Sequence, residues 1–273
     1  MKKRLTVIIA AIIAVILISC IIISPDYVFL SSYNEGKKGF VNINKIERIE
    51  LHNSDNNELK LKKIRKCKNL NTLFIDYNVD DLRFLEGMSL QDLYFLSDCN
   101  DWESLQYIKE IKGLYIIPIY SGNHSTFDNC SILRKFDMLE ELEIINFEEE
   151  IDFSGLEELI NLRTLDISSC YIDFNKISFP DDLENLSLRF GDDNEINHFP
   201  QNIELLNKIN LKKLAFWQSY IEDISFLYNI SNINVIEFHD CIFYETESEI
   251  NTVISDLKKK NVDIILENNT FSE

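Results

Sequence analysis

Apolar side chains recur along most of this chain at one fixed spacing. Between residues 70 and 78, Leu70, Leu73 and Ile75 occupy relative positions 0, 3 and 5, and Asn78 occupies position 8. A strand turns alternate side chains to the same face, so positions 3 and 5 enter a core from a short strand. Position 0 enters the same core from the preceding bend. We therefore expect one short strand in each occurrence of this frame.

The complete frame occurs eight times. Its occurrences are Leu70/Leu73/Ile75, Leu90/Leu93/Phe95, Ile111/Leu114/Ile116, Leu139/Leu142/Ile144, Leu162/Leu165/Ile167, Leu183/Leu186/Leu188, Leu211/Leu214/Phe216 and Ile233/Ile236/Phe238. Successive frames start 20, 21, 28, 23, 21, 28 and 22 residues apart. One such unit cannot bury its apolar face alone, whereas stacked units bury a continuous core. The pattern therefore predicts a solenoid of stacked strands.

This frame and its period resemble the leucine-rich repeat family, and its internalin-like bacterial class in particular. The resemblance covers about residues 46–266. It implies an α/β horseshoe with a parallel sheet on its concave side and a mixed helical and irregular convex side. It also implies a protein that binds a partner and is not an enzyme.

The residues before the repeats show two patterns. Residues 26–45 place the polar turn Asn34–Gly39 between two apolar stretches, which predicts a hairpin that caps the repeat domain. Ile46, Ile49 and Leu51 then give a first, degenerate frame.

The C-terminal part of the chain contains helix signals. Pro200 precedes Ile203, Leu206 and Ile209, a spacing that favours a helix on the convex side. Thr246–Glu249 is a capping box ahead of an apolar stripe that ends near Asn261. We expect a helix there, then a last strand over 262–266 and a polar tail over 267–273.

The first 25 residues are unlike the rest. After the basic start Met1–Arg4, the run Leu5–Ile23 is apolar apart from Thr6, Ser19 and Cys20. As a helix it would measure about 28 Å, close to the roughly 30 Å of a bilayer's hydrocarbon core. The basic flank would remain in the cytoplasm. We therefore expect one N-terminal apolar helix that anchors the protein in the cell membrane with the solenoid outside the cytoplasm.

Two other interpretations of this segment remain open. Leu17–Cys20 resembles the lipobox of bacterial lipoproteins, which implies lipidation of Cys20 and its exposure as the mature N-terminus. Ile21–Ile23 keep the segment apolar beyond that cysteine, which favours an uncleaved signal anchor. A cleaved secretory signal is the third interpretation.

The charge of the chain excludes several partners. The formal net charge is -19, and without Lys2, Lys3 and Arg4 the remainder has 24 basic and 46 acidic residues, or -22. Such a body repels phosphate backbones, so we expect no nucleic-acid partner. No GxGxxG, GxxxxGK[ST] or GxSxG motif occurs in the sequence, so we expect neither a nucleotide cofactor nor a hydrolase-type nucleophile.

Cysteine and acidic residues do not follow metal-site spacings. Five cysteines lie beyond Cys20, an odd number without a CxxC pair, and the four histidines are scattered, so we expect buried thiols and no zinc. The acid-rich stretches 148–150 and 191–195 lack the loop pattern that binds calcium, so we interpret them as solvated loops.

The residues between the core positions are the candidate site. Positions 4, 6 and 7 of each frame are expected to face the concave side, where they gather aromatic and apolar side chains rimmed by charge. Such clusters are typical of protein interfaces. We expect a protein or peptide to dock there, with glycan binding through aromatic rings, or a purely structural scaffold, as alternatives. The candidate partner-binding residues are Phe74, Tyr77, Tyr94, Leu96, Tyr115, Ile117 and Trp217.

Overall fold

The computed structural model describes residues 27–33, 36–53, 58–118, 126–146, 151–169, 176–189 and 203–272. The expected N-terminal helix with Cys20 lies outside these residues, as do the acid-rich stretches 148–150 and 191–195. Within the described ranges, no helix has the length and apolar character needed to cross a bilayer.

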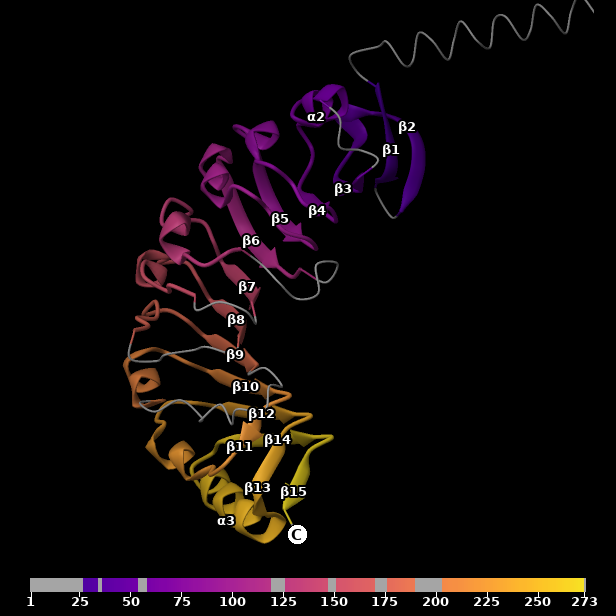
Figure 1. Ribbon diagram of the computed structural model, residues 1–273. Helices are drawn as coiled ribbons and strands as arrows, with labels where there is room; N and C mark the ends of the chain where they lie inside the picture. Colours follow the sequence, from indigo (N-terminus) through magenta and orange to yellow (C-terminus); the bar gives the residue numbers. More distant parts are fainter. Residues whose placement is uncertain are drawn as a thin grey trace, which may run out of the picture.

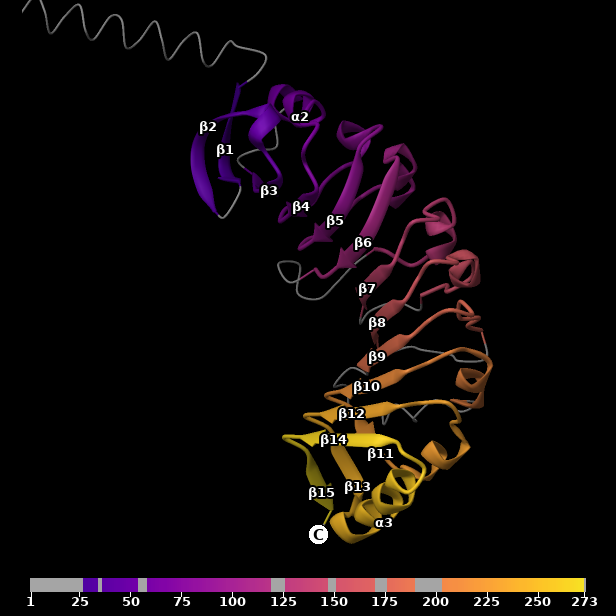
Figure 2. The same cartoon turned by 180° about the vertical axis from the view of Figure 1, so that it is seen from behind.

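One curved 12-stranded sheet runs the length of the molecule, and ten of its strands are parallel neighbours. The sheet lies on the inner side of the arc, and the helices lie on its outer side (Figures 1 and 2). The chain is therefore an α/β solenoid with a mostly parallel sheet. Its parallel strands are β3 (Arg48–Leu51), β4 (Thr72–Ile75), β5 (Ser89–Phe95), β6 (Glu110–Ile116), β7 (Glu141–Asn146), β8 (Thr164–Ser169), β9 (Asn185–Arg189), β10 (Lys213–Trp217), β12 (Val235–His239) and β14 (Asp263–Glu267).

The frame positions form the core, as the spacing predicts. In β4, Leu73 and Ile75 are fully buried, and Leu70 is buried in the bend before it. Phe74 lies between the two core residues and is partly exposed on the other face. The same alternation recurs in most later strands, although in β10 Ala215 is buried as well, and stacking joins the buried positions into one continuous core.

The convex side is built mainly from short 3-10 helices. They are η3 (Arg83–Leu85), η4 (Trp102–Tyr107), η5 (Cys130–Leu133), η6 (Leu156–Glu158), η7 (Ile203–Lys208) and η8 (Ser225–Asn229). The helix expected after Pro200 is η7 in its described part, and it is a 3-10 helix of six residues. A 3-10 helix covers about 2.0 Å per residue against 1.5 Å for an α-helix, which suits short connections.

The first strands close the N-terminal end of the sheet. β1 (Tyr27–Tyr33) and β2 (Lys37–Asn42) form an antiparallel hairpin, and β1 also pairs antiparallel with β3. The 3-10 turn η1 (Ile43–Lys45) leads into β3, and α2 (Glu58–Ile64) follows it on the outer side.

The C-terminal end contains the expected helix and a sheet that the sequence did not reveal. In α3 (Glu247–Lys258), both hydrogen bonds of the capping box between Thr246 and Glu249 are present, and Asn261, shortly after the helix ends, has a left-handed φ of 62°. The segment expected as a polar tail contributes a strand, because β15 pairs with β13 and β13 with β11 in a separate sheet. Its strands are β11 (Tyr220–Ile221), β13 (Ile242–Thr246) and β15 (Thr270–Ser272).

Candidate functional site

Because the parallel strands pair in register, the residues at position 4 form one continuous column along the concave face. Between β4 and β10 its composition changes from aromatic to acidic to small residues. The column consists of Glu50, Phe74, Tyr94, Tyr115, Glu143, Asp166, Ser187, Ala215, Glu237 and Ile265.

Phe74, Tyr94 and Tyr115 form an aromatic stack. The ring centroids of Phe74 and Tyr94 are 4.2 Å apart with an interplanar angle of 1°, and those of Tyr94 and Tyr115 are 4.2 Å apart at 6°. The guanidinium of Arg48 lies over the far side of this column, 4.0 Å from the Phe74 centroid. The rings therefore cover one another's faces and present their edges to the concave side.

Gly113 gives Tyr115 the room that this stack requires. A Cβ atom at Gly113 would lie 2.8 Å from both Cε2 and the hydroxyl oxygen of Tyr115. The Tyr115 hydroxyl donates a hydrogen bond to Oε2 of Glu141 on β7, at 2.6 Å. Burial and that carboxylate raise the pKa of Tyr115, and burial together with Asp92 raises the pKa of Tyr94. Both phenols thus stay neutral and able to donate.

The other residues predicted near the stack divide into two groups. Leu96 and Ile117 are partly exposed at position 6, next to the stack. The prediction for Tyr77 is wrong, because this side chain is 7% exposed and belongs to the core. Inward and outward positions continue to alternate beyond Ile75, so position 7 has the same parity as positions 3 and 5 and turns inward. Ser97 is buried for the same reason.

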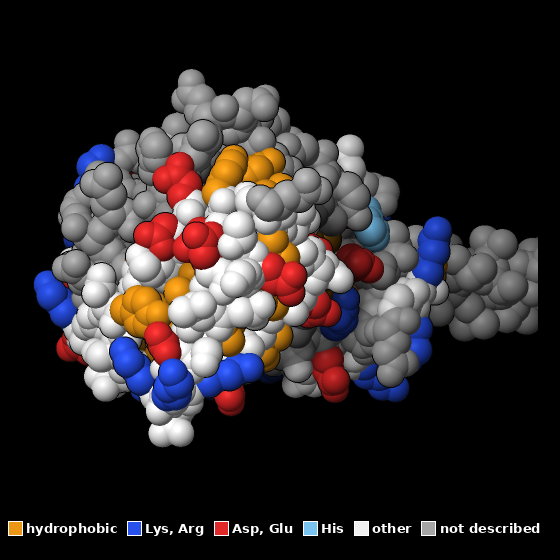
Figure 3. All heavy atoms as spheres, turned by 90° about the horizontal axis from the view of Figure 1, so that it is seen from below, with side chains coloured by type: hydrophobic (Ala, Val, Ile, Leu, Met, Phe, Trp, Pro, Cys, Tyr) orange, Lys and Arg blue, Asp and Glu red, His pale blue; other side chains and the backbone are white. Residues whose placement is uncertain are grey.

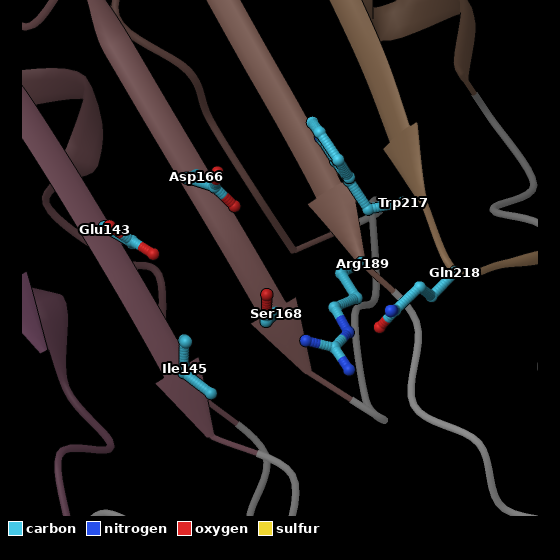
Figure 4. A pocket seen from close by; sticks show the side chains of 7 residues that line it. All are labelled: Glu143, Ile145, Asp166, Ser168, Arg189, Trp217 and Gln218. Atoms are coloured by element: carbon cyan, nitrogen blue, oxygen red, sulfur yellow. The ribbon is translucent and has the colours of Figure 1, made fainter. Parts of the chain in front are cut away.

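Beyond the stack, the concave face is hollowed. The acidic hollow has a volume of about 190 Å³ and lies among β7, β8, β9 and β10 (Figure 4). Burial and the neighbouring Asp166 raise the pKa of Glu143 to about 7. Burial also raises the pKa of Asp166, although the charge of Arg189 partly opposes this rise. The hollow is lined by Glu143, Ile145, Asp166, Ser168, Arg189, Trp217 and Gln218.

Trp217 connects this hollow to a charged cluster on β12. One face of its indole stacks on His239, with ring centroids 4.0 Å apart. His239 in turn contacts Glu237 through Nε2 at 3.1 Å and Glu267 through Nδ1 at 3.0 Å. Lys213 forms an ion pair with the same Glu237 at 2.8 Å. Burial raises the pKa of the Glu237 carboxyl, but Lys213 and His239 together outweigh this effect and lower the pKa. Trp217 is 39% exposed, so its indole remains accessible from the concave side.

The view from the C-terminal end shows how charge is distributed there. Acidic side chains lie across the middle of this face, and Lys and Arg side chains lie mainly at its rim (Figure 3). Apolar side chains are also exposed in the last strands, among them Ile242, Tyr244 and Ile265.

Cysteine and metal chemistry do not define a site in the part of the chain that the structure describes. Cys67, Cys99, Cys130 and Cys241 are free and buried, as the sequence predicted, while Cys170 lies outside the described residues. Burial raises the pKa of all four thiols. Among the described residues, no group of three His, Cys, Asp or Glu side chains could hold a metal ion.

No protein-family model matches this chain, and no curated protein is similar to it in sequence. Among solved structures, internalin C2 from Listeria monocytogenes is similar to it, with 14% identity over 86% of this chain and 79% of the other, and a TM-score of 0.30. The comparison adds no residue to the concave-face site described above.

Proposed function

We propose that this chain is a protein-binding module whose concave face docks a protein or peptide. One observation carries the proposal: the aromatic stack adjoins the acidic hollow in a single in-register column. A partner segment lying across β4–β10 would meet both. Interfaces are typically centred on aromatic anchors with polar groups around them, and this surface has that arrangement. The proposal assigns binding and no chemical step.

The geometry of the rings favours a polypeptide over a glycan. A sugar ring stacks on the open face of an aromatic side chain, whereas both faces of Phe74 and of Tyr94 are covered by a neighbouring ring or by Arg48. Ring edges and the Tyr94 and Tyr115 hydroxyls suit edge-to-face contacts and hydrogen bonds from a peptide. A purely structural role would leave the open hollow next to Trp217 without a use.

Photo-crosslinking tests the docking face directly. We would place benzoylphenylalanine at Tyr94, on the concave side, and as a matched control at Tyr228, an exposed tyrosine in η8 on the convex side. Irradiation of intact cells that produce the protein, followed by mass spectrometry, should yield a defined crosslinked polypeptide from position 94 and not from position 228. Equal crosslinking from both positions, or none from position 94, would reject the concave face.

We also propose that residues 5–23 tether the module to the cell membrane with the solenoid outside the cytoplasm. The apolar run and its basic flank support this. Alkaline carbonate extraction should leave the full chain in the membrane pellet, and recovery in the soluble fraction would contradict the tether. Cys20→Ser distinguishes the two anchors, because it abolishes labelling by a fatty-acid probe only if the chain is a lipoprotein.

A further inference from the structure

We propose that the docked segment is basic, and that one of its lysine or arginine side chains enters the acidic hollow. This inference rests on the proposed function, which it deepens by naming the chemistry of the partner. Its first support is the charge of the whole concave face. Positions 2, 4 and 6 of the ten parallel strands contain nine Asp or Glu residues against three Lys or Arg residues, a net charge of -6.

The second support is the charge balance inside the hollow. Glu143 and Asp166 contribute two carboxylates, and Arg189 contributes one guanidinium that acts on Asp166. None of the described lysine or arginine side chains forms an ion pair with Glu143, so one negative charge among these three side chains remains uncompensated above about pH 7, where Glu143 is ionised. Lys112 on the neighbouring strand β6 pairs instead with Glu140 at 3.1 Å. One cation from outside would complete the balance.

The third support is the size and lining of the hollow. A volume of about 190 Å³ lies below the range of about 300–1,000 Å³ typical of drug-sized ligands. It is close to the roughly 150 Å³ cavity that holds a benzene molecule, and therefore accommodates one side chain. Trp217 and Ile145 offer apolar contact for the methylene groups of a lysine or arginine, and an indole also attracts a cation.

The groups around Glu143 leave its carboxylate available. Tyr115 on β6 is the neighbour on one side, but its hydroxyl is bound to Glu141. Asp166 on β8 is the neighbour on the other side, and Arg189 on β9 lies beyond it. A proton therefore competes with an incoming cation for the Glu143 carboxylate. Because the pKa of Glu143 is about 7, binding of the cation should weaken as the pH falls below that value.

Three blocked pentapeptides, Gly-Gly-Xaa-Gly-Gly with Arg, Lys or Leu in the centre, test the inference on the purified protein. The chain has two tryptophans, of which Trp102 is buried, so fluorescence of the exposed Trp217 reports on the hollow. We expect saturable quenching by the Arg and Lys peptides and none by the Leu peptide. The signal should disappear in Trp217→Phe, which assigns it.

Two charge-matched variants make the test specific. Glu143→Gln should weaken the Arg or Lys peptide at least fivefold at pH 8 and remove the loss of affinity below pH 7. Glu103→Gln removes one negative charge from the exposed convex helix η4 and should change neither the affinity at pH 8 nor its loss below pH 7. Equal quenching by the Leu peptide, or unchanged affinity in Glu143→Gln, overturns the inference. If crosslinking from position 94 persists in that case, the proposed docking face stands and only the basic partner is rejected.

Discussion

The aromatic stack depends on a glycine, so Gly113→Ala should dismantle it without disturbing the backbone. The added Cβ would lie 2.8 Å from the Tyr115 ring and 2.8 Å from Oδ1 of Asp92, and all three close contacts are side-chain atoms. Gly113 lies within β6 and is not among the glycines with a positive φ, so alanine fits its backbone conformation. The contacts are therefore relieved by rotation of Tyr115 away from Tyr94 and by a shift of the Asp92 carboxylate.

The expected cost follows from the two interactions that Tyr115 would lose. An aromatic pair contributes about 0.5–1.5 kcal/mol beyond the area it buries. The hydrogen bond to Glu141 contributes about 0.5–1.5 kcal/mol, at the low end because Glu141 is exposed. Replacing a strand glycine by alanine offsets about 0.5–1 kcal/mol of this loss. The two losses together amount to about 1–2 kcal/mol, so the free energy of unfolding should fall by up to about 1.5 kcal/mol.

Urea unfolding and near-ultraviolet circular dichroism would measure this effect. Gly113→Ala should shift the urea midpoint downward and reduce the tyrosine signal while the far-ultraviolet spectrum stays unchanged. The same substitution made in a Tyr115→Ala background should destabilise much less, because only the Asp92 carboxylate then remains to be displaced. Tyr115→Phe keeps the stack and removes only the hydrogen bond. If Gly113→Ala destabilises equally in both backgrounds, the glycine acts through something other than Tyr115.

Three further outcomes are expected. Between pH 4.5 and 7, Glu143 is protonated in the native state and ionised in the unfolded chain, so the free energy of unfolding falls as the pH rises through this window. In urea titrations, Glu143→Gln should flatten this pH dependence and stabilise the protein by about 1–2 kcal/mol at pH 8. Burial raises the pKa of Cys67 and Cys99 to about 12, so native thiols should alkylate far more slowly than denatured ones, with a count that reductant does not change. Tyr77→Ala truncates a core side chain and should lower the free energy of unfolding in urea by about 3–5 kcal/mol, whereas Leu96→Ala should lower it by about 1 kcal/mol or less. Equal losses for the two variants would contradict the buried position of Tyr77.

The strands were predictable because their signal is local. Leu73 and Ile75 are fixed on one face by the alternation of a strand, and this holds whatever surrounds them. The same rule, applied two residues further, places Tyr77 in the core. The expectation that position 7 faces the concave side departs from this alternation, which continues through the buried Val79.

The convex side and the second sheet were harder to predict for a different reason. A short connection can form a 3-10 turn or an α-helical turn with nearly the same apolar spacing, so Leu206 and Ile209 did not distinguish η7 from an α-helix. β13 and β15 pair with partners 28 residues apart in the chain, Ile242 with Thr270, and neither strand contains a frame residue. Only the stacking of the last two repeats brings these segments together.

The candidate site combines both kinds of information. Sequence register alone placed Phe74, Tyr94 and Tyr115 on neighbouring strands, and neighbouring strands lie about 4.8 Å apart, close enough for rings to stack. Whether they stack or splay depends on the space beneath the rings, which Gly113 provides. The aromatic identity of position 4 is thus a property of single repeats, whereas the closed ring faces, and with them the preference for a polypeptide partner, arise only between repeats. The acidic hollow is an accessible concavity beside the rings, so we expect the proposed partner to gain its specificity from Glu143 and its neighbours more than from the aromatic faces.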